Sequence, residues 1–208
     1  VDLIHDHTHT GFSTIAAAMR IRPPVLITMH GPLEEYFVAS YLRLLRNVSR
    51  GYVNSISDSQ RKGISELPFI GTVYNGIDIE KFPYQEKKEN FLFVIGRITP
   101  DKGQDKAIEV ARRLAKKLVI AGEPERTLRG ERFWHQEIKP QIDYYIEKDR
   151  DPLFSTWRLL TNGNGEARII YFGHANFEQK IELYRRACCL LLPIDWEEPF
   201  GLVMIEAM

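Results

Sequence analysis

Two cationic side chains stand near the ends of a short loop that follows an apolar run. Arg97 and Lys102 lie in the loop 96–103, which begins at Gly96 directly after the apolar run 91–95. Two fixed cations at the end of a strand can neutralise a diphosphate without a metal ion. Charge-assisted hydrogen bonds of this kind contribute about 1.5–3 kcal/mol each. Taken alone, the loop is more typical of a polar turn whose cations point into water, so a diphosphate site needs further residues.

Two carboxylates flank the predicted start of a helix. Glu198 and Glu206 are separated by seven residues, with Gly201 between them. Gly201 lets a ligand approach the backbone closely, and the helix start offers free amide donors to an anion or a hydroxyl. A carboxylate there can accept hydrogen bonds from two sugar hydroxyls. The same residues also fit a structural explanation, with Glu206 on a solvated helix face and Glu198 favourable to the helix dipole.

Histidines alternate at the end of another predicted strand. His5, His7 and His9 would share one face of an extended chain, and His30 ends the next strand. Because this is the spacing of metal ligands, a zinc or manganese hydrolase using His5, His7 and His9 is an alternative function. The chain lacks the further clustered His and Asp ligands that such a site needs, and the two glutamates near the end of the chain would have no role in it.

Short apolar runs alternate with helical patterns along the whole chain, as parallel strands joined by crossover helices require. The predicted fold class is therefore α/β. Ligands of open α/β sheets collect at the carboxyl ends of the strands, which adds Gly122 and Glu123 to the candidate residues. Strands are predicted at 1–4, 25–29, 52–57, 72–74, 91–95, 118–121, 169–172 and 189–192, and helices through 107–115, at 177–187 and after 201. Ser57 and Gln60 have the spacing of a helix cap.

A polar stretch without apolar periodicity, 83–90, separates two halves of the chain. We place a domain boundary there and predict domains at 1–83 and 84–208. The stretch 124–168 interrupts the strand and helix alternation of the second half, with a predicted helix at 131–148 and a Gly/Asn-rich loop at 161–165. We interpret it as an insertion whose aromatic residues pack onto the domain.

The composition is that of an ordinary soluble globular chain. It has 208 residues, with 28 Lys plus Arg against 28 Asp plus Glu and 44% hydrophobic content, which excludes a disordered chain. Acidic and basic residues balance on both sides of Pro83, so we expect no nucleic-acid partner. Apolar runs fall short of the roughly 20 residues that span a bilayer. The adjacent Cys188 and Cys189 are expected to be core residues in a protein of the reducing cytoplasm.

Five segments together resemble the family 4 retaining glycosyltransferases, which have the GT-B fold of two Rossmann-like parallel-sheet domains. The stretch 73–82 resembles the interdomain segment of that family. Gly96 and Arg97, with Lys102 and Gly103, resemble its donor-phosphate loop, and 198–208 resembles its Glu-x7-Glu motif. The stretches 28–31 and 57–60 resemble segments of its first domain.

The resemblance implies roles for individual residues at a site between the two domains. Arg97 and Lys102 would hold the diphosphate and stabilise the charge that develops as it leaves. Glu198 would contact the transferring sugar, and Glu206 would chelate the ribose hydroxyls. His7 matches the histidine that the family places near the transferring sugar, where it could hydrogen-bond that sugar or assist the acceptor. Secondary contacts would come from the backbone of Phe200, Gly201 and Leu202 beside the sugar, and from Gly96, Gly122 and Glu123 near the nucleotide.

The resemblance also implies a reaction. A hexosyl group would pass from a nucleotide diphosphate sugar to an acceptor hydroxyl, with the anomeric configuration retained and with no metal or other cofactor. The partners would be the nucleotide sugar and a carbohydrate, lipid or small-molecule acceptor. We expect a cytoplasmic enzyme, for which peripheral contact with a membrane stays open.

The ends of the sequence predict an internal segment of a longer protein. The chain starts without Met inside a strand-like run and stops without a helix-ending signal after Leu202, so both domains are expected to be incomplete. A third hypothesis follows, in which this segment binds a nucleotide sugar without turning it over.

Overall fold

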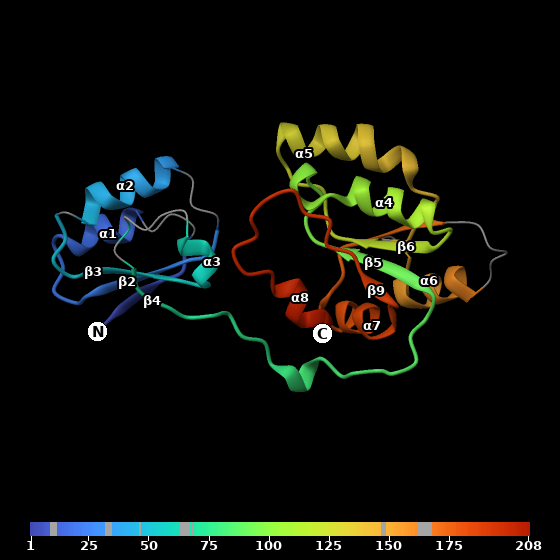
Figure 1. Ribbon diagram of the computed structural model, residues 1–208, viewed down its shortest axis with the longest axis horizontal. Helices are drawn as coiled ribbons and strands as arrows, with labels where there is room; N and C mark the ends of the chain where they lie inside the picture. Colours follow the sequence, from blue (N-terminus) through green and yellow to red (C-terminus); the bar gives the residue numbers. More distant parts are fainter. Residues whose placement is uncertain are drawn as a thin grey trace. The chain divides into compact units, whose positions relative to one another are not determined.

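A computed structural model describes residues 1–8, 12–31, 35–45, 47–62, 67, 69–146, 149–161 and 168–208. The chain forms two compact units, each built on its own parallel sheet (Figure 1). Unit 1 comprises residues 1–76 and 197–202, and unit 2 comprises residues 77–196 and 203–208. Phe82 packs against the core of unit 2.

Unit 1 contains a four-stranded parallel sheet with the strand order β1-β2-β3-β4. Its core forms where Ile15 of α1 packs against Val25 and Ile27 of β2 and Val53 of β3, all with no exposed surface. The strands are β1 (Ile4–Asp6), β2 (Val25–Met29), β3 (Gly51–Ser55) and β4 (Phe69–Thr72), and the helices are α1 (Phe12–Ala18), α2 (Glu35–Leu45) and α3 (Asp58–Arg61).

The predicted helix cap at Ser57 is confirmed. Ser57 Oγ accepts a hydrogen bond of 3.0 Å from the backbone N–H of Gln60 at the start of α3. The Gln60 side chain reaches back, because its Oε1 accepts from the backbone N–H of Ile56 at 3.0 Å. Its amide group donates to the carbonyl oxygens of Met29 and Gly31, and so ties α3 to the end of β2.

Unit 2 contains a five-stranded parallel sheet with the strand order β7-β8-β6-β5-β9. Its strands are β5 (Phe91–Ile95), β6 (Lys117–Ala121), β7 (Tyr144–Tyr145), β8 (Ile169–Gly173) and β9 (Cys189–Leu190). Its helices are α4 (Gln104–Arg113), α5 (Leu128–Phe133), α6 (Pro152–Thr161), α7 (Phe177–Arg186) and α8 (Leu202–Ala207), the last of which begins at a residue of unit 1. The short turns are 3₁₀-helices at Ile79–Lys81, Pro100–Lys102 and Lys139–Gln141 and a π-helix at Trp134–Ile138.

Helices cover both faces of this second sheet, α4 and α5 on one side and α6 and α7 on the other (Figure 1). Alternate residues of β5 serve the two cores, because Leu92 and Val94 pack under α4 while Phe91 and Phe93 face α7. A strand buried on both faces needs a continuous apolar sequence. The predicted α/β class is confirmed by these two parallel sheets.

The predicted helix at 131–148 is wrong in its second half. Helical structure ends at Gln141, and Tyr144 and Tyr145 then form β7, which pairs with β8. Pro140 lies in the terminal 3₁₀-turn, and a proline disfavours continuation of an α-helix. Residues 162–167 of the predicted Gly/Asn-rich loop lie outside the described residues. The expected packing of the aromatic residues is confirmed for Trp134, whose ring centroid lies 4.7 Å from that of Tyr171.

The two cysteines are exposed rather than buried, so the expectation of core residues is wrong. Cys189 begins β9, which pairs with β5 on one side and is an edge strand among the described residues. An apolar run does not by itself show whether its strand is central or at an edge. No helix in the described part of the chain is long and apolar enough to cross a membrane.

Candidate functional site

The strand order of unit 2 indicates where along the edge of its sheet a ligand would bind. The chain passes from β5 to β6 and β8 on one side, and later returns to β9 on the other side of β5. Open α/β sheets bind ligands in the crevice at the carboxyl ends of the strands where the order reverses in this way. The loops at that point are 96–103 after β5 and 191–196 after β9, so topology selects the loop that carries Arg97 and Lys102.

Glycines let the backbone segments at this edge lie directly on one another. Gly122 has φ +136°, and a Cβ at that position would overlap the carbonyl oxygen of Gly96. Gly103 has φ +68°, and its Cβ would overlap the carbonyl oxygen of Pro193 in the loop after β9. Both positions therefore combine a left-handed conformation with backbone-to-backbone contact. The loops after β5, β6 and β9 form one packed edge.

Arg97 is an exposed cation on this edge, and its backbone is firmly held. Its guanidinium contacts Glu125 at 2.9 Å between Nη1 and Oε1, while 71% of the side chain is exposed. Its carbonyl oxygen accepts a 2.9 Å hydrogen bond from the amide of Gln104, which is almost fully buried at the start of α4. Since an exposed ion pair contributes little to stability, an anionic ligand can compete with Glu125 for the guanidinium.

Lys102 is the second cation on the same loop. It ends the 3₁₀-turn that begins at Pro100, and its Nζ lies 4.7 Å from the centroid of the Trp196 ring. The structure therefore brings Arg97 and Lys102 to one edge, together with Gly96 and Gly122.

A polar cavity of about 460 Å³ opens beside this edge, at the carboxyl ends of β6 and β8. Glu123 lines it, and its carbonyl oxygen accepts a 2.9 Å hydrogen bond from the backbone N–H of Ile98 in the cationic loop. The other walls come from α5, the π-helix and the end of β8. They include Arg126, Glu131, Trp134, His135, Tyr171 and His174.

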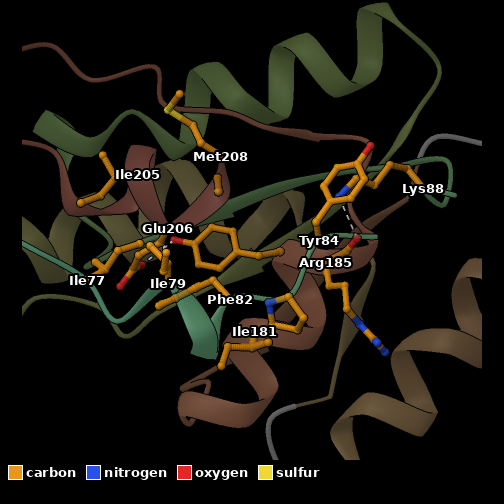
Figure 2. Close-up of a pocket in the computed structure, with 13 residues that line it drawn as sticks. Ile77, Ile79, Phe82, Tyr84, Lys88, Ile181, Arg185, Ile205, Glu206 and Met208 are labelled. Atoms are coloured by element: carbon orange, nitrogen blue, oxygen red, sulfur yellow. Dashed lines mark hydrogen bonds between the residues drawn. The ribbon is translucent and has the colours of Figure 1, made fainter. Parts of the chain in front are cut away.

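Glu206 lies elsewhere in unit 2, on α8. Its Oε1 accepts from Lys180 Nζ at 2.6 Å and its Oε2 from the Tyr184 hydroxyl at 3.0 Å, while only 12% of the side chain is exposed. Burial and the Glu206 carboxylate raise the pKa of Tyr184, so the phenol stays a donor at neutral pH. Glu206 lines an apolar cavity of about 260 Å³ with Ile77 and Phe82 (Figure 2). It does not line the polar cavity beside Arg97.

The His7 region lies at the carboxyl edge of the sheet in unit 1. His7 Nδ1 lies 2.8 Å from His30 Nε2. Nearby, the Thr28 hydroxyl donates to Asn54 Oδ1 at 2.8 Å, so it accepts from His5 Nε2 at 2.7 Å. Partial desolvation of the His30 ring, together with the neighbouring His7 and His5, lowers the pKa of His30. These strand ends therefore carry imidazole, hydroxyl and amide groups that exchange hydrogen bonds with one another.

The described histidines form no metal centre. No group of three or more His, Cys, Asp or Glu side chains that could hold a metal ion occurs in the described part of the chain. His9, the third ligand of the hydrolase alternative, lies outside the described residues. The described residues thus give that alternative no support.

The first half of the predicted Glu-x7-Glu motif packs within unit 1. Ser57 Oγ donates a short hydrogen bond to the carbonyl oxygen of Pro199, and the rings of Phe200 and Tyr74 have centroids 6.2 Å apart. Glu198 is half-buried in the same segment, and Gly201 has φ +80°. Leu202 is the first residue of α8. Sequence reasoning assigned Ser57 to the cap alone and missed this second contact, although a hydroxyl that accepts at a cap can still donate.

Comparison with known proteins identifies the family. The model for "Glycosyl transferases group 1" matches residues 77–208. The chain belongs to the glycosyl transferases group 1 family. The matched residues of this group 1 chain include the loop 96–103 with Arg97 and Lys102, the loop 191–196 after β9, and the whole of α8. No curated protein sequence matches the chain.

Two solved structures share the fold. The crystal structure of AviGT4, a glycosyltransferase involved in avilamycin A biosynthesis, matches with a TM-score of 0.58 and 19% identity, over 100% of this chain and 52% of that one. The crystal structure of TarM matches with a TM-score of 0.62 and 15% identity, over 99% of this chain and 38% of that one. The group 1 chain thus spans about half or less of these two proteins, and the likeness concerns the fold.

Proposed function

We propose that this protein is a retaining glycosyltransferase that moves a hexosyl group from a nucleotide diphosphate sugar to an acceptor hydroxyl. The observation that carries the proposal is the pair Arg97 and Lys102 on the loop where the strand order of unit 2 reverses. A fixed pair of cations at that place suits a diphosphate, and the loop lies within the family match.

In the proposed reaction the bond between the anomeric carbon and the diphosphate oxygen breaks, and the acceptor oxygen bonds to the same face of the sugar. The leaving phosphate takes the proton of the acceptor. Arg97 and Lys102 stabilise the negative charge that grows on the diphosphate. Their side chains provide the positive charge that a metal ion would otherwise provide. Preorganised charge stabilisation is typically worth about 10²–10³ in rate per donor group.

The remaining proposed roles divide between the two units. Glu198 contacts the transferring sugar, and His7 hydrogen-bonds that sugar or assists the acceptor hydroxyl. Glu206 binds the ribose hydroxyls. To do so, its carboxylate must accept from them in addition to, or in place of, the hydrogen bonds that Lys180 and Tyr184 donate to it. Minor contacts come from the backbone of Phe200, Gly201 and Leu202 to the sugar, and from Gly96, Gly122 and Glu123 to the nucleotide. The acceptor is a carbohydrate, a lipid or a small molecule.

A screen of donors tests the proposed function. UDP-, GDP- and ADP-sugars are compared for thermal stabilisation of the protein, and the best donor is then assayed for transfer with and without EDTA. We expect one base to stabilise the protein most, transfer to survive the chelator, and NMR to show the donor's anomeric configuration in the product. Inversion of configuration or loss of activity with EDTA would contradict the mechanism. Stabilisation without any transfer would favour the binding-only alternative.

A further inference from the structure

Two side chains of α7 hold the carboxylate of Glu206. Lys180 Nζ donates to its Oε1 at 2.6 Å, and the Tyr184 hydroxyl donates to its Oε2 at 3.0 Å. We propose that Lys180 and Tyr184 are positioning residues, which orient this carboxylate to accept from both hydroxyls of a ribose, so that the protein selects ribonucleotides over deoxyribonucleotides. The inference rests on the proposed function, because it takes Glu206 to bind the ribose of the donor.

The spacing of the two donors fixes the carboxylate in orientation as well as in place. Lys180 and Tyr184 lie four residues apart on α7, so they share one face of the helix. Because each donates to a different oxygen, the carboxylate group cannot turn about its bond to the rest of the side chain without breaking a hydrogen bond. A binding group whose orientation is held by its neighbours is what a specific site needs.

The carboxylate keeps room for two more hydrogen bonds. An ionised carboxylate offers about four acceptor positions, two on each oxygen. Lys180 and Tyr184 fill one position on each oxygen, and no other residue in the described part of the chain donates to Glu206. One position is left on each oxygen, as two neighbouring hydroxyls require. Glu206 also stays accessible, because it lines the cavity of about 260 Å³ (Figure 2).

Aromatic rings anchor the two donors without competing for the carboxylate. The Lys180 ammonium lies 5.5 Å from the ring centroid of Phe82 and 5.3 Å from that of Phe177, inside the roughly 6 Å of a cation–π contact. The Tyr184 ring packs edge-to-face on Phe93 of β5, with 5.3 Å between the centroids. These rings carry no charge, so they hold the donors in place and leave the ammonium charge to the carboxylate.

The same contacts would also arise in an ion pair that only joins α7 to α8. The two explanations differ in what they predict for ligands. Loss of a structural pair would weaken the binding of ribose and deoxyribose ligands alike. Loss of a positioning pair would weaken mainly the ligand that has both hydroxyls, so the ratio of the two affinities separates the explanations.

The test compares, by calorimetry, the affinities of UDP, GDP and ADP with those of their 2′-deoxy counterparts. For the base that binds most tightly, we expect wild type to prefer the ribonucleotide by about tenfold or more. Lys180→Met and Tyr184→Phe should each reduce this preference by about threefold or more, and Lys180→Arg should retain more of it than Lys180→Met. Arg186→Met is the matched control, because it removes the cation of another partly buried ion pair of α7, with Glu89, and it should leave the preference unchanged.

Thermal unfolding checks that each variant is folded, and Lys180→Gln replaces Lys180→Met if the latter does not fold. An unchanged preference in either folded variant would overturn the inference and leave Glu206 as a ribose ligand. A similar fall of the preference in Arg186→Met would also overturn it, since the effect would then come from the stability of α7. Equal affinities of wild type for ribonucleotide and deoxyribonucleotide would overturn the ribose role of Glu206 as well, and no binding of any nucleotide would overturn the proposed function itself.

Discussion

The carboxyl edges of the two sheets carry different chemistry on the same kind of scaffold. In unit 1, the strand ends present His7 and His30 in contact with each other at 2.8 Å. In unit 2, the corresponding edge presents Arg97 and Lys102 on glycine-packed loops. Both sheets are parallel and follow the same β–α alternation. Residue type at the strand ends, not the architecture, therefore distinguishes the two edges.

This difference suggests a division of labour. Fixed cations attract an anion through charge, so the edge in unit 2 suits the diphosphate of the donor. Imidazole rings can exchange hydrogen bonds and protons with hydroxyl groups, so the edge in unit 1 suits the sugar or the acceptor. Changes in unit 2 should then weaken donor binding and turnover together, whereas changes in unit 1 should act on transfer and on its pH dependence.

The largest expected effect is on Lys102. Lys102→Ala should lower donor turnover by about 10²–10³, because it removes one of the two cations that we propose stabilise the leaving diphosphate. Steady-state kinetics with saturating acceptor measures it, and Lys102→Arg is the matched control that keeps the charge. Near-normal turnover in Lys102→Ala would show that Lys102 does not stabilise the leaving diphosphate.

Glu206 tests whether a residue of unit 2 has both a structural and a functional role. Removing one partner of a partly buried pair leaves Lys180 without its anion, so Glu206→Ala should lower the free energy of unfolding by about 3 kcal/mol. It should also lower donor turnover severely. Urea unfolding and kinetics are measured on the same variant, and Glu206→Gln keeps the shape without the charge. Full turnover in a folded Glu206→Ala protein would show that Glu206 does not bind the ribose.

Glu198 should separate sugar contact from nucleotide contact. Glu198→Ala is expected to impair transfer about tenfold or more while changing the affinity for free nucleotide little, because the charged hydrogen bond that we propose for Glu198, of about 1.5–3 kcal/mol, goes to the sugar alone. Calorimetry with the nucleotide and with the nucleotide sugar makes the comparison. Equal losses of affinity for both ligands would show that Glu198 does not recognise the sugar.

His30 gives the smallest expected effect, a change in how stability depends on pH. Since its pKa is lowered in the folded state, the folded protein binds fewer protons there than the unfolded chain does. Its contribution to stability is complete above the usual pKa of about 6.5 and is lost as the pH falls through the lowered value. Urea unfolding between pH 7.5 and 5 should be less pH-dependent in His30→Gln than in wild type. Identical pH profiles would contradict this.

The sequence predicts the buried parallel strands best. The bounds of β2 and β5 agree with the predicted ranges 25–29 and 91–95, because strands covered on both faces are continuous apolar runs between polar loops. The cationic loop was found by the same rule, since it follows β5 directly. The helix predicted through 148 failed because pairing of Tyr144 and Tyr145 with β8 is a long-range interaction, and local periodicity does not report it.

The partners of the candidate site residues are less accessible to sequence reasoning. Lys180 and Tyr184 lie more than twenty residues from Glu206 and contact it only because α7 and α8 pack together. Trp196 meets Lys102 because β9 returns beside β5, although the two residues are ninety-four positions apart. Residue types indicate which groups could act, and the strand order decides which of them meet.

Calorimetric titration of the nucleoside, the nucleoside monophosphate and the nucleoside diphosphate into wild type and into an Arg97→Ala/Lys102→Ala variant tests the central claim most directly. If Arg97 and Lys102 bind the diphosphate group, wild type binds the nucleoside diphosphate most tightly, and this affinity falls as salt is added. The variant loses the preference for the nucleoside diphosphate and keeps its affinity for the nucleoside. Equal affinities for the three ligands in wild type, or an unchanged preference in the variant, would contradict it.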